Sequence, residues 1–150
     1  MRTRRWAVLI GLGAVLLAVV LIGVRPKTPG QFRSTVETSV QNAVSSVGTA
    51  RVTGQTALRG NTFGPYESTV LEDARKSVAT AISDIAESSV PDESSRDLRD
   101  EVLPLLQDSA RLLGDLDAGL EDDDRAAATG AVDGLTAAGE KLTTVLEGLR

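Results

Sequence analysis

An uninterrupted apolar run near the start of the chain constrains the architecture more than any other feature. Residues 6–24 contain only Trp, Ala, Val, Leu, Ile and Gly. These 19 residues, at about 1.5 Å each in a helix, come close to the ~30 Å thickness of a bilayer core. The run therefore predicts a single-pass transmembrane anchor at residues 6–24, after a short N-terminal segment at residues 1–5.

A cleaved signal peptide is the alternative interpretation of this run. The apolar part of such a peptide is roughly 7–15 residues long and is followed by a small-residue cleavage site. The run here is longer, and the only small candidate before a cut is Gly23, with the bulky Leu21 at the matching upstream position. We favour an uncleaved signal-anchor, and a cleaved, secreted form is the alternative.

The flanking charges predict the orientation of the anchor. Arg2, Arg4 and Arg5 precede the run, whereas only Arg25 and Lys27 closely follow it. Positive residues prefer the cytoplasmic side of a membrane. We therefore expect a cytoplasmic N-terminus in the cell membrane, a linker at residues 25–30 and an extracytoplasmic domain at residues 31–150. Arginine far outnumbers lysine, and the chain is rich in alanine, glycine and valine. This composition is typical of a GC-rich bacterial genome.

One face of the predicted anchor carries the small residues Ala7, Gly11, Ala14 and Ala18. Small residues spaced three and four apart let two membrane helices approach closely. This spacing raises the hypothesis of transmembrane self-association and a homo-oligomer. Chance is the alternative explanation, because alanine and glycine are common in this run.

The remaining sequence predicts an all-α fold. Apolar residues recur every three or four positions in four stretches, residues 31–58, 66–89, 92–118 and 123–149, and turn-forming residues separate these stretches. Short connections make successive helices antiparallel neighbours, so we expect an up-down-up-down four-helix bundle. A three-helix bundle with a loose first segment is the alternative, because Gly48, Gly54 and the surrounding Thr and Val residues lower the helix propensity of residues 31–58.

The same periodicity predicts which residues face the core, where helices kink and where they end. Pro104 should kink the third helix, and Gly119 should end it. The expected inward residues are Phe32, Val36, Val40, Ala43, Val47, Ala50 and Ala57; Val70, Ala74, Val78, Ala81, Ile82 and Ile85; Leu98, Val102, Leu105, Leu112, Leu116 and Leu120; and Ala128, Ala131, Leu135, Ala138, Leu142, Val145 and Leu149.

Residue types needed for catalysis and for tight metal binding are missing. The chain has no cysteine and no histidine, so thiolate ligands, imidazole ligands and the commonest general base are absent. Lys76 beside Ser77 matches no catalytic motif, and an enzyme is the least favoured class. We expect no cofactor and no metal.

Acidic residues cluster between residues 115 and 124, but their spacing does not match a calcium loop. A loop beginning at Asp115 would need an acidic or amide residue where Gly119 stands and a glycine where Leu120 stands. Helix capping explains Asp122, Asp123 and Asp124 better, and weak divalent-cation binding is the alternative.

Charge also limits the class of partner. Three of the 16 basic residues precede the apolar run, which leaves 13 basic against 21 acidic residues after it, a net charge of −8. An acidic domain repels nucleic acid, so we expect no nucleic-acid partner.

Aromatic residues are scarce, and two of them share one predicted turn. Phe63 and Tyr66 lie between the first two helical stretches, at the end of the bundle predicted to be far from the membrane. They either cap the end of the core or contact a protein partner, because aromatic residues are enriched in binding hot spots. The sequence thus predicts an interaction or scaffolding module of the cell envelope. A small-molecule-sensing bundle that signals through a membrane partner is the alternative.

Overall fold

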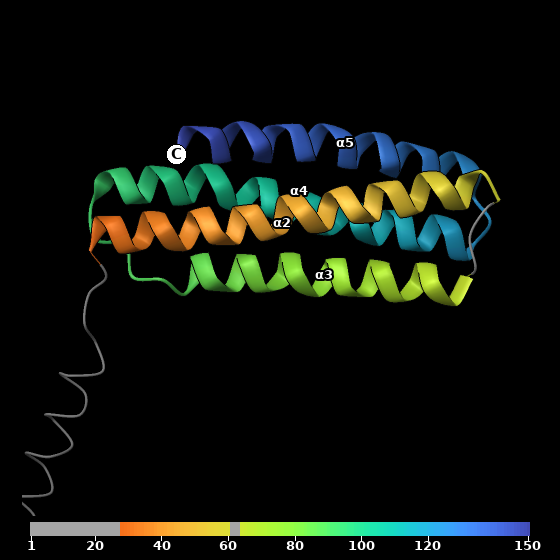
Figure 1. Cartoon of the computed structure of the whole chain (residues 1–150), viewed down its shortest axis with the longest axis horizontal. Helices are drawn as coiled ribbons and strands as arrows, with labels where there is room; N and C mark the ends of the chain where they lie inside the picture. Colours follow the sequence, from red (N-terminus) through yellow and green to blue (C-terminus); the bar gives the residue numbers. More distant parts are fainter. Residues whose placement is uncertain (1–27, 61–63) are drawn as a thin grey trace, which may run out of the picture.

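The computed structural model describes residues 28–60 and 64–150 and confirms an all-α fold over them. Within these two ranges there are four helices and no strand: α2 (Pro29–Leu58), α3 (Gly64–Ala86), α4 (Glu93–Glu121) and α5 (Arg125–Gly148). Successive helices run in opposite directions along one another, as expected for an up-down-up-down bundle (Figure 1). No helix within the described ranges is long and apolar enough to cross a membrane, and the predicted anchor, residues 6–24, lies outside those ranges.

The four helices form a bundle with a flattened cross-section. α2 and α4 contact each other and both remaining helices, whereas α3 and α5 do not contact each other. Figure 1 shows the same arrangement, with α2 and α4 in the middle and α3 and α5 at the outside. The two central helices therefore lie on the short diagonal of the bundle.

The first helix is an integral part of the core, so the alternative of a loose first segment is wrong. α2 packs against all three other helices and buries nine of its residues, among them Phe32, Val40 and Val47. Its glycines and threonines lower the intrinsic helix propensity, but tertiary packing of the buried face outweighs that cost.

The start of α2 lies inside the predicted linker, residues 25–30. Thr28 is the N-cap: its side chain accepts the Gln31 N–H at 3.3 Å, and the Gln31 side chain accepts the Thr28 N–H at 3.0 Å. Pro29 occupies the first helical turn, where the absence of its N–H costs nothing. The reciprocal capping box satisfies two N–H groups and therefore starts the helix at Pro29, earlier than predicted.

The predicted core face is mostly correct, with α4 and α5 rotated slightly from the expected orientation. Seven of the expected inward positions are only half-buried: Ala57, Val70, Ile82, Leu98, Leu105, Leu120 and Val145. Neighbouring residues take the central places instead: Leu71, Leu106, Leu113, Val132 and Leu146 are buried. Adjacent helix positions differ by about 100° in direction, so a modest rotation exchanges one leucine for the next.

Gly119 does not end the third helix, contrary to the prediction. It is buried within α4, and a Cβ there would lie 2.8 Å from the backbone nitrogen of Ala128 on α5. The residue is therefore needed for close approach of the two helices. The turn between them comes slightly later: Asp123 has a positive φ of 54°, and Asp124 is the N-cap of α5. Asp124 is a helix cap, as predicted.

Pro104 lies within α4, which is continuous from Glu93 to Glu121. Its side chain is exposed, so the ring projects away from the core. The kink expected near it stays a prediction. At the start of the same helix, Asp92 is the N-cap and accepts the Ser95 N–H at 2.8 Å.

Two arginines join α2 and α5 at both ends of this antiparallel pair. Near the start of α2, Arg33 donates to the carbonyl oxygens of Gly148 at 2.9 Å and Leu149 at 3.2 Å, at the end of α5. At the other end, Arg125 in the first turn of α5 donates to the carbonyl oxygen of Leu58, the last residue of α2. Each arginine satisfies carbonyl groups that a helix C-terminus leaves without an intrahelical partner.

Candidate functional site

Of the two predicted partner-contact residues, the structure describes Tyr66. It is in the first turn of α3 and is 59% exposed. This exposure favours the contact interpretation for Tyr66 over a place in the core. Phe63 lies outside the described residues, as do the candidate self-association residues Ala7, Gly11, Ala14 and Ala18.

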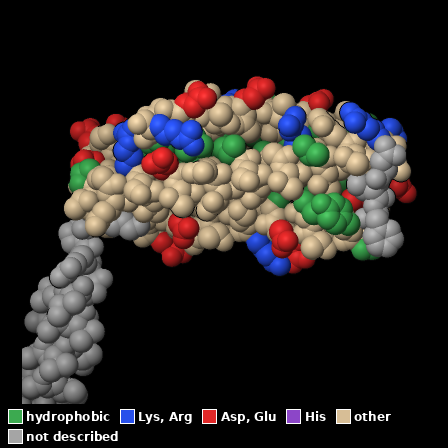
Figure 2. Space-filling model, in the orientation of Figure 1, with side chains coloured by type: hydrophobic (Ala, Val, Ile, Leu, Met, Phe, Trp, Pro, Cys, Tyr) green, Lys and Arg blue, Asp and Glu red, His purple; other side chains and the backbone are tan. Residues whose placement is uncertain are grey.

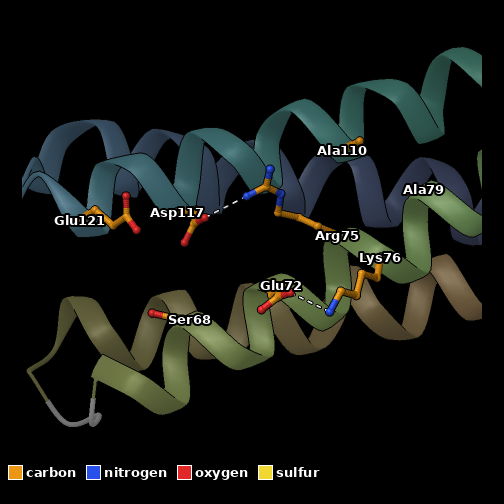
Figure 3. A pocket seen from close by; sticks show the side chains of 8 residues that line it. All are labelled: Ser68, Glu72, Arg75, Lys76, Ala79, Ala110, Asp117 and Glu121. Carbon is orange, nitrogen blue, oxygen red and sulfur yellow. Dashed lines mark hydrogen bonds and ion pairs between the residues drawn. The ribbon is translucent and has the colours of Figure 1, made fainter.

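An open groove of about 710 Å³ runs between α3 and α4 (Figure 3). Ala79 on α3 and Ala110 on α4 leave room in it, because their side chains end at Cβ. The remaining lining residues are all polar or charged: Ser68, Glu72, Arg75, Lys76, Asp117 and Glu121. Such a lining suits an extended polar surface more than a small apolar ligand.

Two ion pairs organise the charges in this groove. Arg75 extends from α3 and donates from Nη1 to Asp117 Oδ2 on α4 at 3.0 Å (Figure 3). Lys76 Nζ lies 2.7 Å from Glu72 Oε1 one turn earlier on α3. The hydrogen bond from Lys76 holds the pKa of the Glu72 carboxyl below its ordinary value, and the same bond raises the pKa of Lys76. Both groups are therefore charged at neutral pH.

The groove continues towards the end of the bundle that carries Tyr66. A smaller hollow of about 170 Å³ shares Ser68, Asp117 and Glu121 with it and adds Gly64 and Leu120, among others. Gly64 belongs to the same first turn of α3 as Tyr66. The groove therefore reaches the same end of the bundle as Tyr66, although Tyr66 itself lines neither hollow.

Three of the six acidic residues between positions 115 and 124 form contacts within the protein. Asp115 pairs with Arg111 at 2.6 Å, Asp117 pairs with Arg75, and Asp124 caps α5. Among the described residues, no group of three or more acidic side chains is arranged to hold a metal ion. These contacts give half of the acidic residues in the cluster a structural role.

The only lysine–serine neighbours singled out by sequence are not arranged for nucleophilic chemistry. Lys76 and Ser77 point to different partners: Lys76 pairs with Glu72, and the Ser77 hydroxyl accepts from Ser46 on α2 at 2.8 Å. A lysine base needs a lowered pKa, whereas that of Lys76 is raised. This pair therefore serves the α2–α3 contact and the surface of α3.

The groove was not predictable from the sequence. Arg75 and Asp117 are 42 positions apart, and their pairing depends on the register between α3 and α4. The helical periodicity of each stretch carries no information on that register. Comparison of the chain with protein-family models, with curated proteins and with solved structures finds no match. Its function is therefore inferred from the residues of the chain itself.

Proposed function

We propose that the chain is a membrane-anchored, extracytoplasmic interaction module that contacts a protein partner through the end of the bundle carrying Tyr66. The exposure of this tyrosine in the first turn of α3 is the observation that carries the proposal. Tyrosine is one of the residue types that are enriched in binding hot spots.

The arrangement of the helix ends supports this proposal. α2 begins at the same end of the bundle at which α5 finishes, since Arg33 contacts the carbonyl of Leu149. The α2–α3 and α4–α5 connections lie at the other end (Figure 1). If residues 6–24 anchor the chain, Tyr66 and the mouth of the groove are held about one bundle length away from the bilayer, where a partner can reach them.

The pockets found around the described residues favour a protein partner over an internal small-molecule ligand. The largest is the open groove between α3 and α4, and the core between the helices is filled by large buried side chains such as Phe32, Leu106 and Leu135. Within the described ranges, no buried side-chain nitrogen or oxygen lacks a hydrogen-bond partner. Nothing inside the bundle therefore favours the sensing alternative.

Photo-crosslinking in cells tests the proposal directly. A photoreactive phenylalanine analogue replaces Tyr66 in the full-length chain, and adducts in the membrane fraction are identified by mass spectrometry. The matched control places the same analogue at Thr144, an exposed position on α5. We expect one discrete adduct from position 66 and none at that mass from position 144.

A second variant tests whether the contact extends to the groove. Ser68 is exposed and lines both hollows, so loss of the adduct on Ser68→Arg, but not on Thr144→Arg, would place the groove within the same contact. Loss of the adduct on Phe63→Ala would assign the second predicted aromatic to the same contact. If position 66 yields only self-adducts or none, the bundle end is not a partner-binding surface.

A further inference from the structure

Between residues 34 and 52, the outward side of α2 differs from the surface of the other three helices, because its exposed positions carry no charge. These positions are Ser34, Thr38, Gln41, Asn42, Ser45, Thr49 and Val52, and the two charged residues of this range, Glu37 and Arg51, are half-buried. Most are three or four apart, so they form one stripe along the helix. We call these seven residues the α2 outer face.

The exposed positions of α3, α4 and α5 each include five or more charged residues. Figure 2 shows the contrast: the band along α2 is largely tan, and red and blue side chains gather along its two edges. The region after residue 27 holds 11 basic and 21 acidic residues, a net charge of −10. An uncharged stripe of this length is thus exceptional on a strongly acidic domain.

Two of the six polar side chains of this face form hydrogen bonds within α2 itself. The Thr38 hydroxyl donates to the Ser34 carbonyl at 3.0 Å, and the Thr49 hydroxyl donates to the Ser45 carbonyl at 2.9 Å. Burying a polar group is costly mainly when its hydrogen bond is lost. A second surface can therefore cover these threonines without breaking their bonds.

We propose that the α2 outer face binds the same face of a second copy of this chain, with the two α2 helices parallel about a twofold axis. The parallel direction rests on the proposed membrane anchorage, which would hold both copies in one orientation. In a twofold parallel pair, each residue on the axis lies opposite its own copy. Any charged residue there would face a like charge, so the contact must be uncharged along its whole length.

The α2 outer face is the surface of the described bundle that meets this requirement. A second acidic copy approaching α3, α4 or α5 would meet net like charge, which disfavours those contacts. Charge therefore indicates a second copy as the partner, because an identical, acidic domain can come close only along a helix face that lacks exposed charge.

The size of the face indicates a weak association that depends on tethering. Its 18-residue rise corresponds to about 27 Å of helix. One pair of helices of that length buries much less than the ~800 Å² per partner that is usual in stable complexes. Two copies confined to one membrane have a high effective concentration, which makes a weak contact effective.

Disulfide scanning tests the pairing, because the chain contains no cysteine. Ser34→Cys and Val52→Cys are made separately in the full-length chain and oxidised mildly in membranes. Both lie on the α2 outer face, at its opposite ends. Thr80→Cys is the matched control, since Thr80 is exposed on α3. We expect disulfide-linked dimers from both α2 variants, at least about fivefold above the control.

Other crosslinking patterns overturn the proposal. An antiparallel pair would place Ser34 opposite Val52, so neither single variant would form a dimer. Equal crosslinking from Thr80→Cys would indicate random collision or contact through the membrane segment alone. Neither outcome depends on the Tyr66 adduct, so failure of this inference is distinguishable from failure of the proposed function.

A charge exchange gives the second readout. Thr49→Glu should weaken self-association about tenfold, because like charges meet across the axis. Thr80→Glu is the matched control for Thr49→Glu, since the hydroxyl of each threonine donates to the carbonyl oxygen four residues earlier. Mixing Ser45→Glu chains with Ser45→Lys chains should restore pairing between the two variants. An equal effect of Thr49→Glu and Thr80→Glu, or no restoration in the mixture, would overturn the twofold arrangement.

Discussion

Replacing Gly119 by alanine should destabilise the bundle, although alanine is the better helix former. A Cβ at this position would lie 2.8 Å from the backbone nitrogen and 3.1 Å from the Cα of Ala128. Ordinary contacts begin near 3.4 Å, so α4 and α5 must separate locally by several tenths of an ångström. The short connection through Asp122, Asp123 and Asp124 resists that movement, since it joins the two helices directly beside the contact.

The expected magnitude combines two opposing effects. Overpacking costs about 1–3 kcal/mol, and a clash with backbone belongs at the upper end because no side-chain rotation relieves it. Alanine regains about 1 kcal/mol of helix propensity, which leaves a net loss of about 2 kcal/mol. Gly130 on α5 is the matched control, because a Cβ there has no neighbour within 4 Å. Gly130→Ala should therefore stabilise the protein by about 1 kcal/mol.

Urea unfolding of the full-length protein, followed by circular dichroism, measures both effects. With a slope of about 2 kcal/mol per molar urea, the midpoint should fall by about 1 M for Gly119→Ala and rise by about 0.5 M for Gly130→Ala. A Gly119→Ala midpoint at or above that of the unmodified protein would refute the close approach of α4 and α5. Gly119 would then act as a local helix terminator.

Three further predictions test the core, a helix cap and an arginine contact. Leu106→Ala should cost about 2–5 kcal/mol in urea unfolding, and Leu105→Ala clearly less, because Leu106 is fully buried and Leu105 half-buried; equal losses would contradict the observed helix rotation. Hydrogen bonds with Ser95 hold the pKa of Asp92 in the folded protein below its ordinary value. The ionised Asp92 therefore stabilises the fold fully above the ordinary pKa, and this contribution is lost as the pH falls through the lowered pKa. Thermal melts should consequently show a shallower loss of stability below about pH 4 for Asp92→Asn than for the unmodified protein; parallel curves would argue against the cap. Arg33→Met should increase hydrogen exchange in the last turn of α5 by about fivefold, since it removes the donor to two terminal carbonyls; unchanged exchange there would show that the contact has no effect on α5.

The sequence predicted the parts of this protein that depend on local patterns. Apolar residues at helical spacing predicted four helices, and the acidic residues that include the N-cap Asp124 marked the start of the last one. Most of the buried positions also followed from that spacing, because a helix must turn its apolar side inward whatever it packs against.

Other features were decided only by packing between helices. α2 has a composition that is weak for a helix, yet contact with three neighbours holds it in the core. The choice of Leu106 over Leu105 depends on the rotation of α4 against its neighbours, which one stretch of sequence does not specify. The α3–α4 groove and the pairing of Arg75 with Asp117 depend on the register between two helices.

Glycine illustrates the difference between the two levels. By helix propensity alone, Gly54, Gly119 and Gly130 are equivalent, since each costs about 1 kcal/mol relative to alanine. In the bundle, a Cβ on Gly54 would meet Leu116 and Val132 at 2.9 Å and one on Gly119 would meet backbone, while one on Gly130 would meet nothing. Local sequence determined that these segments are helical, because periodicity and capping act within a few residues. Only the tertiary structure decided which glycines are needed, because that depends on the distance to a neighbouring helix far away in sequence.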